Sequence, residues 1–248
     1  MNDSYSETGE AESQRYSIDL LLLTCAAGLL DALSYLRAGV FTANMTGNTV
    51  VLGLALIGPD RSKVLPATVA LFCFALGALS AGAILLWLNP DNDRRRDLTV
   101  GLGWELVFLT TFALLSITGN SDPSISPLVP AATAAVALGA QSVAVRKLRI
   151  SGVVTTFMTG TITTAAMSVV GNDREAAQHN GGEHSSPRLL VAMLGCYVLA
   201  AALGAALRKQ VIIVSVLPLV LVATVEIRWW IVNRTGHLPG NGSQPRVR

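Results

Sequence analysis

The fold class is decided by PATVALFCFALGALSAGAILLWL, residues 66–88, a stretch without a single charged side chain. A helix needs about 20 mostly apolar residues to cross the hydrocarbon core of a bilayer. Residues 66–88 meet this length, and five other stretches of the chain resemble them. The sequence therefore predicts six membrane-spanning helices, at residues 18–36, 66–88, 98–118, 128–148, 187–207 and 211–231.

The composition of the whole chain agrees with a membrane protein. Of its 248 residues 51% are hydrophobic, and the mean hydropathy is +0.52. Only 14% of the residues are charged, whereas a soluble domain usually contains about 25%. The net charge of +2 is too close to zero to favour a nucleic-acid partner. We therefore expect an all-α polytopic helix bundle whose principal partner is the lipid bilayer.

Two shorter apolar stretches, residues 40–57 and 152–170, each contain the tripeptide M-T-G. The rule that cytoplasmic loops are rich in Lys and Arg tests whether they cross the membrane. If both crossed, the 18 Lys and Arg would divide nine to nine, whereas without full crossings 13 lie on one side and five on the other. The charges therefore favour six spans in the cell membrane with both termini in the cytoplasm. Re-entrant segments and short helices both fit the two stretches.

The M-T-G stretches belong to an internal repeat. GVFTANMTG at 39–47 aligns with GVVTTFMTG at 152–160, and Gly28-Leu-Leu-Asp31 lies where the second half has Gly139-Ala-Gln-Ser142. Downstream, Cys73-Phe-Ala-Leu76 matches Cys196-Tyr-Val-Leu199. A repeat with three crossings enters the membrane from opposite sides in its two copies, as in many secondary transporters. We therefore predict two inverted repeats, residues 18–118 and 119–231, between disordered tails at 1–17 and 232–248.

Asp31 is the sharpest candidate for a functional residue. A charged side chain inside the bilayer is costly and marks a binding site by default, so its carboxylate is a candidate for binding a proton, a cation or a substrate amine. The alternative is a structural carboxylate that local hydroxyls or the side chain of Arg37 satisfy. The sequence leaves both interpretations open.

Polar residues of the M-T-G stretches and of the fifth predicted helix extend this candidate site. Thr and Asn side chains satisfy backbone groups that a broken helix leaves free, and two such stretches would meet near the middle of the membrane. The alternative is ordinary tight packing between helices. Together with Asp31, the predicted substrate- or ion-binding residues are Asn44, Thr46, Asn48, Gln141 and Thr159.

Two further carboxylates, Glu105 and Glu226, are expected near the membrane interface, and Arg228 is the expected partner of Glu226. The run H-N-G-G-E-H at 179–184 has three potential metal ligands in a Gly-rich loop, but structural zinc normally takes four. We expect a solvated loop there. The sequence also contains no P-loop, no G-x-S-x-G and no H-E-x-x-H. It therefore predicts no catalytic residue, no metal site and no cofactor.

Several of these motifs resemble the YoaK-like family of bacterial membrane proteins. They are AGLLD at 27–31, VFTANMTGNTVVLGL at 40–54, GAQS at 139–142 and TTFMTGT at 155–161. The resemblance implies a small multi-pass protein with about six spans and no established activity. Where the family usually has Asn after the Gln of the second half, this chain has Ser142.

The features together favour a transporter or permease for a small solute. In this hypothesis Asp31 couples a proton or cation, and Thr46, Asn48, Gln141 and Thr159 line the site. The alternative is a membrane binding or assembly protein in which the small residues serve helix packing and partner docking. An intramembrane enzyme comes third, because no nucleophile–base pair and no second carboxylate lie near Asp31 in the sequence.

Overall fold

The computed structural model describes residues 3–88, 94–122, 124–147, 150–151, 162–163, 166, 183–184 and 187–235. Within them the long elements are all α-helices: α1 (Asp3–Ala38), α2 (Met45–Ile57), α3 (Val64–Leu88), α4 (Arg94–Ser121), α5 (Leu128–Lys147), α8 (Pro187–Ala206) and α9 (Val211–Thr235). A single 3-10 turn, η1 (Arg61–Lys63), leads into α3. Two two-residue strands, β1 (Ile150–Ser151) and β2 (Glu183–His184), pair in parallel.

Six helices of the described part are long and apolar enough to cross a membrane, which confirms the predicted multi-pass α-helical class. The spans are Tyr16–Ala38, Arg61–Leu88, Asp97–Ser121, Leu128–Lys147, Arg188–Ala206 and Val211–Ile231. The start of α1 differs from the expectation. Its backbone is helical from Asp3 onward, within the stretch expected to be a disordered tail.

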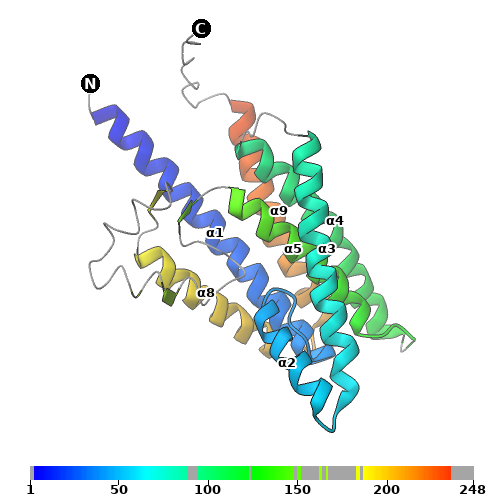
Figure 1. The fold of residues 1–248 in the computed structure, drawn as a ribbon. Coiled ribbons are helices and arrows are strands. Elements are labelled where there is room, and N and C mark those ends of the chain that lie inside the picture. Colours follow the sequence, from blue (N-terminus) through cyan, green and yellow to red (C-terminus); the bar gives the residue numbers. More distant parts are fainter. Residues whose placement is uncertain are drawn as a thin grey trace.

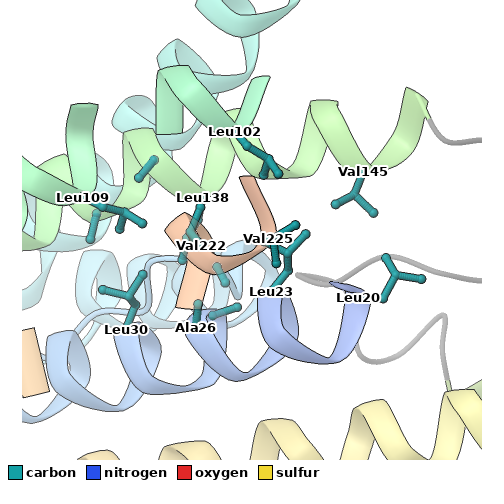
Figure 2. Close-up of a cluster of buried hydrophobic side chains, with 14 of the residues drawn as sticks. Leu20, Leu23, Ala26, Leu30, Leu102, Leu109, Leu138, Val145, Val222 and Val225 are labelled. Atoms are coloured by element: carbon teal, nitrogen blue, oxygen red, sulfur yellow. The ribbon is translucent and has the colours of Figure 1, made fainter. Parts of the chain in front are cut away.

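The helices form a bundle in which two groups meet (Figure 1). α1 packs against α8 and α9, whereas α5 packs against α3 and α4, and the contact between α4 and α9 joins the groups. Figure 2 shows the shared core, to which α1 contributes Leu23, α4 contributes Leu109 and α9 contributes Val222. In lipid this core is held by close packing and not by exclusion of water, because lipid tails are as apolar as leucine.

Glycines allow the helix backbones to approach each other closely. A Cβ atom at Gly28 of α1 would meet the main chain of Tyr197 in α8, and one at Gly139 of α5 would meet the main chain of Phe74 in α3. Glycine at such positions lets membrane helices pack tightly. These two contacts explain why α1 pairs with α8 and α5 pairs with α3.

Helix α2 is too short to span the bilayer. Its 13 residues give a length of about 20 Å at 1.5 Å per residue, against about 30 Å of hydrocarbon. The chain leaves α1 through Gly39, whose φ of 70° suits glycine. A Cβ on Gly39 would contact the side chain of Lys63, the last residue of η1 before α3. The stretch between these residues therefore begins and ends at one face of the bundle, as a re-entrant segment does.

Most of the second M-T-G stretch lies outside the described residues. Of residues 152–170, only 162–163 and 166 belong to the described part of the chain. The predicted site residue Thr159 therefore lies outside the described residues. The same holds for residues 179–182 of the loop expected to be solvated, and for the C-terminal tail after Thr235.

Candidate functional site

The carboxylate of Asp31, on the buried side of α1, collects hydrogen bonds from the loop that precedes α2. The backbone N–H groups of Thr42 and Ala43 each donate to Asp31 Oδ1 over 2.6 Å, and the Thr42 hydroxyl donates over 3.0 Å. The other oxygen, Oδ2, accepts from the N–H of Asn44 at 3.2 Å and from the Tyr197 hydroxyl of α8. We refer to Asp31, Thr42, Ala43, Asn44 and Tyr197 as the Asp31 cluster.

The Asp31 cluster satisfies a carboxylate that is only 2% exposed. An ionised carboxylate offers about four lone-pair positions, and five donors surround this one. Of the partners that the sequence suggested for Asp31, a nearby hydroxyl is present in Thr42, and the hydroxyl of the distant Tyr197 adds a second. Arg37 is not among the hydrogen-bond partners of Asp31 in the described residues. The carboxylate therefore joins α1, α8 and the loop before α2.

Two asparagines hold the same loop from its other side. Asn48 is fully buried, its side-chain oxygen accepts from the N–H of Phe41 at 2.9 Å, and its amide group donates to the Phe41 carbonyl at 2.7 Å. Asn44 caps α2, because its side-chain oxygen accepts from the N–H of Gly47 at 3.1 Å. The T-A-N-M-T-G-N run therefore forms a turn, and the N–H groups of this turn that make no helical hydrogen bond face Asp31.

The remaining predicted site residues lie elsewhere. Thr46 is exposed on α2. Gln141 is fully buried on α5, and its side-chain amide donates to the carbonyl of Leu23 at 3.3 Å. Leu23 precedes Asp31 by eight residues of α1, which corresponds to about 12 Å along the helix. The structure thus brings Asp31, Asn44 and Asn48 together around one loop and places Gln141 at a different depth.

A second polar layer closes the opposite end of the bundle, where α1 enters and α9 leaves. Asp19 accepts from Arg228 Nε at 2.9 Å and from Trp229 Nε1 at 3.0 Å. Lys147 of α5 lies 4.0 Å from Asp97 of α4. The expectation that Arg228 pairs with Glu226 is therefore wrong, because on a helix residues two apart point in different directions and Arg228 faces α1.

Glu105, which the sequence predicted to lie near the membrane interface, has its side chain inside the bundle. Its side chain is fully buried, and neither carboxyl oxygen has a hydrogen-bond partner in the described part of the molecule. One turn away on either side lie Leu102 and Leu109, both in the core shown in Figure 2. Spacings of three and four residues place all three on one helix face. This spacing was the signal in the sequence that could have indicated the burial of Glu105. Hydropathy averaged over the whole helix does not show which face a residue lies on.

Comparisons with known proteins agree with the membrane architecture. Residues 20–227 match the model of a family described as protein of unknown function (DUF1275). The chain is also 33% identical to the UPF0700 transmembrane protein YoaK of Bacillus subtilis (strain 168) over 158 residues, which cover 63% of this chain and 68% of that protein. No solved structure matches.

Proposed function

Because this chain belongs to the DUF1275 family of proteins, and because it is built as a multi-pass membrane bundle, we propose that it is a transporter or permease for a small solute. The observation that carries this proposal is the Asp31 cluster. There, a carboxylate buried among the spanning helices binds successive N–H groups of an unwound segment and one hydroxyl of a neighbouring helix.

Broken segments of this kind have a recurrent use in membrane proteins. Non-helical backbone at membrane depth is tolerated only where it is buried in protein or lines a cavity, and discontinuous helices form the binding sites of many secondary transporters. Packing alone does not require a carboxylate, whose placement in the membrane is costly. The hydrogen bonds of the Asp31 cluster can form or break together. Such a cluster suits a loop that switches between a bound and a released position.

In this proposal Asp31 acts on the solute through the loop that it binds. All the acceptor positions of its carboxylate are engaged in the present arrangement. Release of the loop would free both the carboxylate and the N–H groups of residues 42–44. Of the predicted lining residues, Asn48 moves with this loop, whereas Thr46, Gln141 and Thr159 would contribute elsewhere along the path.

The inverted-repeat arrangement is part of the proposal, and the helix contacts support it. In the aligned halves, Gly28 corresponds to Gly139 and Tyr197 corresponds to Phe74. The contact of Gly28 with Tyr197 therefore has the contact of Gly139 with Phe74 as its counterpart. Alternating access in such folds comes largely from one repeat moving against the other. The charge distribution supports a cell-membrane location with both termini in the cytoplasm.

A binding or assembly protein without transport activity is the second candidate. The observation that favours it is the apolar outer surface of α2, where Val50, Leu54 and Ile57 are 58%, 70% and 92% exposed. Lipid can cover such a surface, and so can a partner helix. This candidate predicts a co-purifying protein and no effect of any solute on stability.

A thermal-shift screen of the purified protein against small solutes and ions separates the two candidates, because a ligand that binds only the folded state raises its stability. A solute that stabilises the protein is then tested for uptake into proteoliposomes. We expect Asp31→Asn to abolish uptake while the protein remains folded. The matched control is Asp60→Asn, since Asp60 is exposed and caps only the turn at Ser62.

The outcomes of this experiment decide the proposal. Transport by the control together with loss of transport in Asp31→Asn supports it. No stabilising solute in the screen, or a solute whose uptake is the same in Asp31→Asn and wild type, contradicts it.

A further inference from the structure

Glu105 of α4 and Glu226 of α9 lie on two helices that pack against each other, and neither belongs to the Asp31 cluster. Glu105 is enclosed by the bundle core, and both of its carboxyl oxygens are buried without a hydrogen-bond partner among the described residues. Glu226 follows Val225, a member of the same buried cluster as Leu102 and Leu109, and its own Oε2 is likewise buried without a partner among the described residues. Two buried carboxyl groups thus lie on contacting helices, among apolar residues of one cluster.

Among the described residues, the helices around this pair supply no positive charge at the same level of the bundle. On α9, Arg228 binds Asp19, and on α5 the cationic residues are Arg146 and Lys147 at its last turn, where Lys147 lies beside Asp97. The only titratable side chain of α3 is Cys73. Gly101 of α4 contacts Ala144 of α5. Helices α4 and α5 run antiparallel. One turn from this contact, Glu105 of α4 is therefore level with Gln141 of α5, which is uncharged.

The surroundings of Glu105 and Glu226 favour binding of a proton over binding of a metal cation. A charged carboxylate that is buried without donors or a counter-ion is strongly disfavoured, so the group takes up a proton or binds a cation. Metal cations such as Ca²⁺ and Mg²⁺ take about six or more oxygen ligands, whereas the flanking residues on these faces are Leu102, Leu109, Val222 and Val225. No group of three or more His, Cys, Asp or Glu that could hold a metal occurs in the described part of the chain.

We propose that Glu105 and Glu226 form a proton-binding carboxyl pair, in which Glu226 exchanges protons with one face of the membrane and Glu105 holds the proton within the bundle. Glu226 is partly exposed and Glu105 is not. Protons therefore enter and leave the pair through Glu226. Glu226 lies about one turn from Trp229, in the polar layer at the end of the bundle. Use of the pair to drive solute movement rests on the proposed transport function, whereas proton binding itself does not.

Carbodiimide labelling tests proton binding directly. N,N′-dicyclohexylcarbodiimide is apolar and reacts with protonated carboxyl groups in membrane interiors. The carboxyl proton moves to one nitrogen of the reagent while the carboxyl oxygen bonds to its central carbon. In apolar surroundings the acyl group then shifts from oxygen to nitrogen, and the stable N-acylurea keeps every atom of both reactants. The adduct is therefore detected by intact mass, and its position by peptide mapping.

With the full-length protein in liposomes, we expect one adduct at Glu105 or Glu226 that forms more slowly as the pH is raised. Glu105→Gln and Glu226→Gln together should remove it. Asp31 is the internal control, because its carboxylate is surrounded by donors and should stay unmodified. Asp60→Asn, at the exposed turn, should leave the labelling unchanged.

The proposal fails if the wild-type protein gains no adduct at either glutamate at any pH, or if the adduct maps to Asp31 instead. It also fails if the yield of adduct does not change with pH. Mapping of the wild-type adduct decides the matter even if the double variant does not fold. Labelling at Glu105 in a protein that moves no solute would overturn the transport proposal and leave the proton-binding pair intact.

Discussion

Replacement of Asp31 measures how much of the stability depends on the loop before α2. Asp31→Ala removes the acceptor for the N–H groups of Thr42, Ala43 and Asn44 and for the hydroxyl of Tyr197. Each buried donor left unsatisfied costs about 1–3 kcal/mol. Hydrogen bonds inside membrane proteins contribute less on average, about 0.6 kcal/mol in measured cycles. Since Thr42 and Ala43 are almost fully buried, we expect a loss of about 4 kcal/mol from these combined terms.

Asp31→Asn should cost roughly half as much. An asparagine oxygen can still accept from Thr42 and Ala43, whereas its NH₂ group cannot accept the bonds from Asn44 and Tyr197. With two hydrogen bonds lost at about 1 kcal/mol each, the expected loss is about 2 kcal/mol.

Equilibrium unfolding in mixed detergent micelles, followed by circular dichroism, gives both values, and Asp60→Ala serves as the exposed control. Hydrogen exchange adds a local readout, because the amides of residues 42–44 should be protected in the wild type and exchange rapidly in Asp31→Ala. The reasoning is refuted if Asp31→Ala unfolds within about 0.5 kcal/mol of the wild type, the range of an ordinary surface substitution, or if exchange at residues 42–44 is unchanged.

Two further substitutions test the packing of the bundle and the loop. Gly139→Val places side-chain atoms against the main chain of Phe74 and should destabilise the protein by about 1–3 kcal/mol or more. The control Gly82→Ala, with no atom within 4 Å of its Cβ, should leave the stability unchanged. Equal unfolding midpoints of the two variants would show that α3 and α5 do not touch at Gly139. Asn48→Ala removes both bonds to Phe41 and should speed hydrogen exchange at residues 41–44 without altering the spanning helices, and exchange as slow as in Thr49→Ala, the exposed neighbour, would argue against this role.

The sequence predicted the spanning helices because hydropathy summed over about 20 residues is a strong signal. It also selected Asp31, Asn44 and Asn48, since polar residues stand out within apolar stretches. It could not show that these residues bond to one loop, because that depends on how residues 39–44 fold back toward α1.

The burial and partners of the other charged residues could not be predicted from the sequence either. Arg228 turned toward Asp19, more than 200 positions earlier in the chain, and such a pairing depends on which helices become neighbours. Glu105 was placed near the interface because distance from the helix end was the only guide, whereas its burial depends on which face α4 presents to α9. The function proposed for Thr159 stays a prediction, as does that for Thr46 and Gln141.

The central claim is that the chain crosses the membrane six times while residues 39–57 enter and leave on one side. Labelling of single cysteines with a membrane-impermeant maleimide in intact cells tests it most directly, with Cys25, Cys73 and Cys196 first replaced by alanine. The account predicts that Arg37→Cys, Ser62→Cys and Arg208→Cys are labelled from outside, and that Arg146→Cys is labelled only after the membrane is opened. Labelling of positions 37 and 62 from opposite faces would contradict it, since α2 would then be a full span.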